Sequence, residues 1–109
     1  MSEKASCPCG ETCVLQSALN KIGGKWKLPI LCSLTANGTS RYNDLLRSIN
    51  GISNTMLSKS LKELEDDGMV IRREYMEVPV RVEYTVSKRA ESLQPILLDL
   101  IQWQLDGKE

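Results

Sequence analysis

Five polar or basic side chains recur at helical spacing in the middle of the chain, just after an Asn-Gly turn. Short amide and hydroxyl side chains can hydrogen-bond to base edges, whereas lysines neutralise phosphates, so this mixture suits a helix in the major groove of DNA. At 100° per residue, the set lies opposite the buried-type stripe that contains Leu57, Ser60, Leu61 and Leu64. This predicted reading face consists of Asn54, Thr55, Ser58, Lys59 and Lys62.

An ordinary solvated helix face could have the same composition, so the neighbouring residues must decide between the two interpretations. Four acids crowd the last turns of the same helix, where they would repel phosphates and oppose the helix dipole. They are Glu63, Glu65, Asp66 and Asp67. Only the N-terminal half of this helix is therefore expected to face a duplex.

Arginines flank the reading face on both sides in the sequence. Arg41 precedes it, and Arg72, Arg73 and Arg81 follow it in a segment with strand character. An arginine there can reach phosphate or the narrow minor groove, although three nearby glutamates, Glu74, Glu77 and Glu83, could pair with it instead. We predict DNA contacts from Arg41, Arg73 and Arg81, with Arg81 favoured among the hairpin arginines.

The cysteines offer a second kind of chemistry. Cys7, Cys9 and Cys13 lie within seven residues, whereas Cys32 lies alone in an apolar run and is predicted to be a small core residue. A thiol at a helix N-terminus has a stabilised thiolate, so Cys13 could sense oxidants. The same three thiols could instead hold zinc with one more ligand, which would be Cys32, a carboxylate, water or another chain's cysteine, because the sequence has no histidine. They could also be incidental residues of a flexible tail.

Four helices are predicted to position these groups. Apolar residues recur with a period of 3.6 in four successive segments, and a glycine follows each segment, as is usual at helix C-termini. Ser40 is predicted to cap the third helix, and Ser53 or Asn54 the fourth. The predicted helices cover residues 12–22, 25–36, 41–49 and 54–67.

A hairpin and a C-terminal helical region follow. The segments 69–75 and 81–86 are rich in β-branched and aromatic residues, and the connection 76–80 contains Pro79, so it should project as an irregular wing. Ser87 is predicted to cap a helical region that bends at Pro95. The apolar face of that region is wider than one small core requires, which indicates a partner surface.

This order of elements is that of a winged helix-turn-helix. The predicted class is α+β and mainly α, with N- and C-terminal helices for dimerisation. Residues 1–11 are predicted to be a disordered cysteine-containing tail, and residues 12–109 a single DNA-binding domain. A length of 109 residues with 41% hydrophobic content fits one domain.

The composition excludes several functional classes. The formal net charge is zero, so DNA binding would depend on local patches rather than on bulk charge. No apolar run reaches the roughly 20 residues of a membrane span, and no signal peptide is evident, so a cytoplasmic protein with no membrane partner is expected. With no histidine and no paired-carboxylate site, neither an enzyme nor a cofactor is expected.

The chain after Cys13 resembles the HxlR-type regulators, which are winged-helix relatives of the MarR regulators. The resemblance rests on five segments, Ile22-Gly23-Gly24-Lys25-Trp26, Arg41-Tyr42-Asn43-Asp44-Leu45, Gly51-Ile52-Ser53 with Met56-Leu57, residues 61–68, and residues 77–84. It implies a homodimer whose recognition helices enter successive major grooves of an inverted repeat. Two positions depart from the family pattern, since Val14 and Val80 stand where proline is common.

The resemblance also bears on the signal. Several members of the family are thiol switches with a cysteine just ahead of the first helix, and Cys13 has the matching position. We therefore predict a homodimeric, sequence-specific regulator of transcription, a repressor in preference to an activator, that responds through Cys13 to oxidants or electrophiles, with Cys7 and Cys9 as further redox candidates. A small-molecule effector is a second option. The alternatives are a protein-interaction module without specific DNA binding and a metal-responsive regulator.

Overall fold

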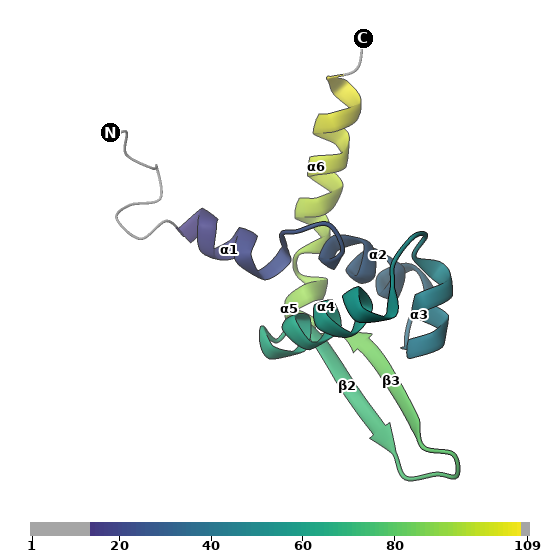
Figure 1. The fold of residues 1–109 in the computed structure, drawn as a ribbon. Coiled ribbons are helices and arrows are strands. Elements are labelled where there is room, and N and C mark those ends of the chain that lie inside the picture. The colour runs from purple at the N-terminus through teal and green to yellow at the C-terminus, as the bar shows by residue number, and fades with distance from the viewer. Residues whose placement is uncertain (1–13, 108–109) are drawn as a thin grey trace.

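The computed structural model describes residues 14–107, so the predicted tail of residues 1–11, with Cys7 and Cys9, and also Cys13 lie outside them. Figure 1 shows helices α2, α3 and α4 gathered at the base of a long hairpin, with α1 and α6 reaching away from them. The winged helix-turn-helix prediction is confirmed. The elements are α1 Val14–Ile22, α2 Lys27–Asn37, β1 Ser40–Arg41, α3 Tyr42–Ser48, α4 Asn54–Asp66, β2 Val70–Tyr75, β3 Arg81–Val86, α5 Lys88–Glu91 and α6 Gln94–Asp106.

The core lies where α2, α3 and α4 meet the base of the sheet. Its largest fully buried side chains come from these three helices, each at the apolar period expected of a helix packed on one side. Burying one such side chain contributes roughly 1.5–3 kcal/mol, so this cluster fixes the orientation of α4. The side chains are Ile30, Leu34, Leu45, Leu57, Leu61 and Leu64.

Two predicted caps are confirmed. The Ser53 hydroxyl accepts a hydrogen bond from the Met56 amide at 3.1 Å, and that of Ser87 accepts one from the Ala90 amide at 3.2 Å. At the other end of α4, Gly68 has φ +77°, a left-handed conformation that glycine adopts without a steric penalty. The chain therefore turns sharply from α4 into β2.

The predicted cap at Ser40 is wrong. Ser40 lies in the two-residue strand β1, opposite Tyr84 of β3, and its hydroxyl donates to the Gly38 carbonyl at 3.0 Å. Helix α3 begins at Tyr42, and Arg41 precedes it with extended backbone. The sheet has three strands in the order β1-β3-β2. The two residues of β1 are too few to show an alternating pattern, so the sequence contains no signal for this strand.

Strands β2 and β3 form the predicted antiparallel hairpin, with Arg72 opposite Tyr84 and Tyr75 opposite Arg81. The connection 76–80 stands at the far end of this hairpin, away from the helices (Figure 1). We call the hairpin and its loop, residues 70–86, the wing. Its base joins the core, whereas its tip is free of the helices.

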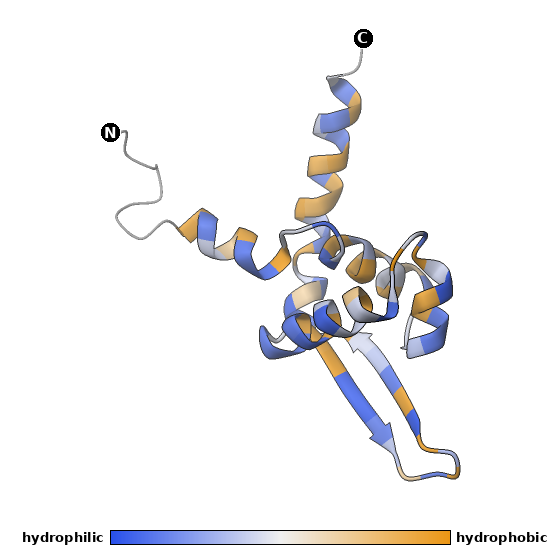
Figure 2. Cartoon of the chain, viewed as in Figure 1, coloured by the Kyte–Doolittle hydropathy of each residue, from blue (hydrophilic) through white to orange (hydrophobic). Residues whose placement is uncertain are grey.

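The C-terminal region is divided as predicted near Pro95. Helix α5 ends at Glu91, and Pro95 lies in the first turn of α6, where its missing amide hydrogen costs little. Neither α1 nor α6 has a buried residue, although both are rich in apolar side chains, as the orange segments of α6 in Figure 2 show. A small domain rarely leaves so much apolar helix exposed without a partner.

Candidate nucleic-acid interface

The structure exposes the whole reading face. Asn54, Thr55, Ser58, Lys59 and Lys62 are all exposed on α4, whereas Leu57, Ser60, Leu61 and Leu64 on the opposite side are buried. The predicted division of the helix into two faces is therefore confirmed. The role of the exposed face in DNA binding stays a prediction.

Charges along α4 are arranged unevenly. Lys62 pairs with Asp66 at 3.3 Å, and Glu63 pairs with Lys27 of α2 at 3.2 Å. Among the described residues, Lys59 has no ion pair. Since ion pairs between exposed groups contribute only about 0–1 kcal/mol, Lys62 can exchange Asp66 for a phosphate at little cost. Both lysines are therefore available to a polyanion.

Tyr42 is a site residue that the sequence did not reveal. Its hydroxyl lies 3.0 Å from the carbonyl oxygen of Asn54, 3.1 Å from Oδ1 of Asn54 and 2.9 Å from Oγ of Ser58. The ring is half-buried between α3 and α4. Tyr42 therefore holds two of the five side chains of the reading face.

In the wing, Arg81 is already engaged. Its guanidinium lies 3.2 Å from the Glu77 carboxylate and 3.4 Å from that of Glu83, and it stacks over the ring of Tyr75 at 4.2 Å. Arg73, which lies opposite Glu83 in the register, is exposed and has no ion pair within residues 14–107. The structure thus favours Arg73 over Arg81 as the freely available cation of the wing.

Arg72 was not singled out for a DNA contact, yet it lies beside the reading face. It lines a hollow of about 200 Å³ together with Ser58, Lys62 and Tyr84. A hydrogen bond to Tyr84 raises the pKa of the Arg72 guanidinium, which also pairs with Glu74 at 3.4 Å. Strand alternation could have revealed this position, because Arg72 shares its face of the sheet with Tyr84 rather than with Arg81.

Arg41, the last predicted contact, is exposed on β1 next to α3. It lies opposite Glu83 in the sheet but forms no ion pair in the part of the chain that the structure describes. Together, Arg41, Arg72 and Arg73 place cations near the helix-turn-helix and along the wing. Such a set can bind the phosphates that flank a groove occupied by α4.

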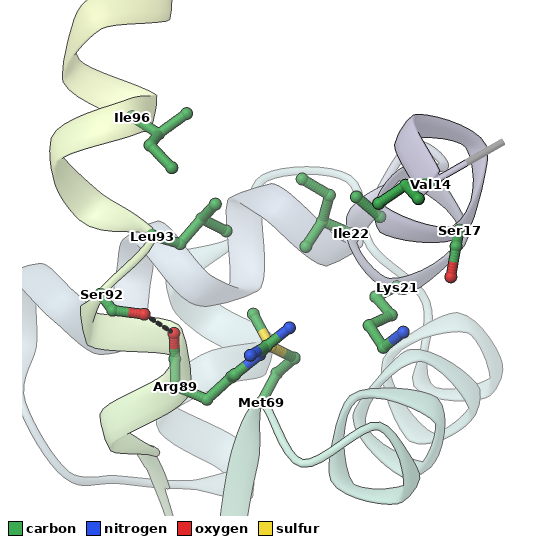
Figure 3. Close-up of a pocket in the computed structure, with 10 residues that line it drawn as sticks. Val14, Ser17, Lys21, Ile22, Met69, Arg89, Ser92, Leu93 and Ile96 are labelled. Carbon is green, nitrogen blue, oxygen red and sulfur yellow. Dashed lines mark hydrogen bonds between the residues drawn. The ribbon is translucent and has the colours of Figure 1, made fainter. Parts of the chain in front are cut away.

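A cavity of about 340 Å³ separates α1 from α5 and α6 (Figure 3). Val14 and Ile22 of α1, Leu93, Ile96 and the buried Met69 give it apolar walls. The side chains of Lys21 and Arg89 also line it, from α1 and α5. Apolar side chains of both α1 and α6 therefore border this cavity.

Cys32 is exposed, so its prediction as a core residue is wrong. It comes directly after the buried Ile30 and Leu31, and the helical rotation of one further residue turns its side chain out of the core. There it lines a hollow of about 300 Å³ beside Leu97 and Ile101 of α6.

Within residues 14–107, no three His, Cys, Asp or Glu side chains form a group that could hold a metal ion. None of the helices within residues 14–107 is both long and apolar enough to span a membrane.

Comparisons with known proteins agree with this geometry. A family model described as an HxlR-like helix-turn-helix matches residues 21–108. The uncharacterized HTH-type transcriptional regulator YdzF of Bacillus subtilis is 44% identical over 85 residues, which make up 78% of this chain and 78% of that protein. The solved structure of the redox regulator HypR in its oxidized form has a TM-score of 0.78 and 35% identity, covering 89% of this chain and 99% of that one. The reduced form of the transcriptional regulator YodB from B. subtilis has a TM-score of 0.80 and 31% identity, covering 95% and 96%.

Proposed function

The chain belongs to the HxlR-like helix-turn-helix family, and from this premise we propose that two copies bind an inverted repeat in duplex DNA, with one reading face in each half-site. Its relatives are HTH-type transcriptional regulators, and it is a DNA-binding regulator of this kind. The observation that carries the proposal is the exposed reading face, oriented by the buried leucines behind it and adjoined by Arg72. We assign the chain no catalytic role. We also propose that it acts in the cytoplasm, where a regulator of this class would meet its DNA.

The proposed contacts divide into two kinds. Asn54, Thr55 and Ser58 have hydrogen-bonding groups short enough to reach base edges from a helix in the major groove. The cations bind phosphates and fix the orientation of the protein without reading sequence. In order along the chain these cations are Arg41, Lys59, Lys62, Arg72 and Arg73. Arg81 is less available to a phosphate, because it forms ion pairs with Glu77 and Glu83.

The exposed helices support a dimer. Leu100 and Trp103 of α6 are 52% and 70% exposed, and Leu15 and Leu19 of α1 are 58% and 45% exposed. Pairing these faces about a two-fold axis would bury them in both chains and would place two reading faces on one duplex. Since half-sites lie about one helical turn apart, this arrangement matches a palindromic operator.

Removing both lysines of the reading face tests the DNA-binding proposal. The variant K59A/K62A is expected to bind the operator at least tenfold more weakly. Because each lost phosphate contact lowers the steepness of the plot of log affinity against log salt by about 0.9, the slope should fall by about two. Fluorescence anisotropy with operator DNA at several salt concentrations measures both quantities.

Lys88→Ala is the matched control, since it removes an exposed lysine of α5 outside the reading face. It should leave affinity and slope close to those of the native chain. An unchanged slope in K59A/K62A would show that the reading face has been assigned to the wrong side of the protein. Retention of a stoichiometric protein partner, with no retention on duplex DNA, would instead favour the interaction-module alternative.

We further propose that the output is repression and that an oxidant relieves or alters it through Cys13, which lies outside the described residues. Among the similar solved structures, one is of the redox regulator HypR and another is of diamide-treated YodB, which supports an oxidant as the signal. Diamide would take two electrons and two protons from two thiols as they join in a disulfide, Cys13 supplying one, and Cys7, Cys9 or the second chain the other.

Treatment with diamide is expected to change operator affinity by roughly 5–150-fold, the usual range of coupling between two sites. Cys13→Ser should abolish this response, whereas Cys32→Ser, which removes an exposed thiol of α2, should keep it. Affinity measured before and after oxidation, and again after dithiothreitol, distinguishes the variants. Equal responses in both serine variants would exclude Cys13 as the sensor, and a response that instead follows added zinc would favour the metal alternative.

A further inference from the structure

We propose that the phenol of Tyr42 determines which groups of the reading face donate hydrogen bonds to DNA and which accept them. In this arrangement Ser58 accepts a hydrogen bond from the amino group of a base. This inference rests on the proposed function, because it assumes that α4 lies in a major groove. It assigns to Tyr42 a positioning role in sequence recognition, and to Ser58 a preference for cytosine or adenine.

The three contacts of the Tyr42 hydroxyl carry the inference. The oxygen lies 3.0 Å from the Asn54 carbonyl, 3.1 Å from Asn54 Oδ1 and 2.9 Å from Ser58 Oγ. Asn54 is the first residue of α4, and Ser58 follows one turn later on the same side of the helix. The half-buried Tyr42 thus reaches both exposed side chains from α3, on their inner side.

Counting hydrogens fixes the direction of each bond. A tyrosine hydroxyl has one hydrogen, and both oxygens of Asn54 can only accept. The Tyr42 hydrogen therefore serves Asn54, and the short contact to Ser58 obtains its hydrogen from the serine. Turning the Asn54 amide over exchanges Oδ1 for Nδ2 but does not change this result, because the 3.0 Å contact between the Tyr42 hydroxyl and the Asn54 carbonyl joins two oxygens, and only tyrosine can supply the hydrogen between them.

These bond directions determine which hydrogen-bonding groups the outer side of the reading face presents. The only hydroxyl hydrogen of Ser58 points inward to Tyr42, so toward solvent Ser58 presents lone pairs alone. In the major groove only cytosine N4 and adenine N6 donate hydrogen bonds, whereas guanine and thymine present acceptors. Asn54, whose Oδ1 is engaged by Tyr42, presents its amide hydrogens and so complements a base acceptor.

Tyr42→Phe is the test, because it removes the hydroxyl and keeps the ring that packs on the core. Duplexes selected from a random pool by the native protein define the operator, and affinity is then measured for all four bases at each position. The position whose preference is lost in Ser58→Ala is the one that Ser58 faces. The native protein should prefer cytosine or adenine there by about tenfold.

In Tyr42→Phe this preference should shrink to about twofold, since the freed serine hydroxyl can then donate as well as accept. Preferences elsewhere in the half-site should persist, apart from the position facing Asn54. Because Tyr42 acts through Ser58, the double variant Y42F/S58A should have the same profile at this position as S58A alone. Tyr75→Phe, which removes a phenol in the wing, is the matched control and should keep the native profile.

Three results would overturn the inference while leaving the proposed function intact. The first is a native base profile in Tyr42→Phe, and the second is a uniform loss of affinity with unchanged preferences, which would mean that Tyr42 only anchors α4. The third is a preference of the native protein for guanine or thymine at the Ser58 position. A native protein that selects no sequence at all would remove the proposed function together with the inference.

Discussion

Replacing Leu100 with aspartate is expected to convert the proposed dimer to a monomer and to weaken operator binding by at least 100-fold. Leu100 is 52% exposed on α6, in line with Ile96 and Trp103 at helical spacing. Burying a leucine contributes roughly 1.5–3 kcal/mol, whereas burying an unpaired carboxylate is costly. A two-fold interface includes every substitution twice, so both effects double.

The loss of DNA affinity follows from the loss of the second reading face. When two linked modules bind two half-sites, the second event is intramolecular, and the gain in affinity is about 10²–10⁴-fold. A monomer binds one half-site only and forfeits this gain. Sedimentation equilibrium should give the chain mass of 12.2 kDa for the variant and about twice that for the native protein. Anisotropy with full and half operators completes the measurement.

Gln102→Asp is the matched control for this experiment. It introduces the same charge on α6, but on the polar stripe that also carries Asp99 and Asp106. The control should remain dimeric and bind the operator as the native protein does. If Leu100→Asp kept the native mass, the dimer interface would have to lie elsewhere on the molecule, and the exposed α6 face would need another occupant.

Signals that are local in sequence predicted the helices, two caps and the hairpin well. Ser53 and Ser87 each directly precede a helix and use their hydroxyls as expected, because capping depends on residues only three positions apart. Strand β1 could not be predicted in the same way. It exists only because Ser40 and Arg41 lie against β3, more than 40 residues later in the chain.

The candidate site shows the same limit. The reading face follows from the helical period alone, and all five of its residues are exposed as predicted. By contrast, the contact of Tyr42 with Ser58, the proximity of Arg72 to the same helix and the engagement of Arg81 by two glutamates all join separate elements. Their partners are set by packing, which periodicity does not encode. Cys32 was misplaced because one residue of helical rotation separates a buried position from an exposed one.

The second large effect concerns the core residue that orients the reading face. Leu57 is fully buried, with 0% exposure, on the side of α4 opposite Ser58 and Lys59. Its truncation to alanine removes three carbon atoms from a packed cluster that cannot collapse fully around the gap. Such changes cost about 2–5 kcal/mol, which is a large share of the roughly 5–15 kcal/mol that stabilises a small domain.

Leu57→Ala should therefore lower the urea midpoint sharply with little change in the slope of the unfolding transition, because the surface exposed on unfolding is nearly the same. Met56→Ala, which trims the neighbouring, 36% exposed side chain, should cost under about 1 kcal/mol. Urea unfolding followed by circular dichroism, at one fixed protein concentration, compares the two because dimer stability depends on concentration. If Leu57→Ala were no less stable than Met56→Ala, α4 could not be held by this cluster, and the outward orientation of the reading face would lose its physical basis.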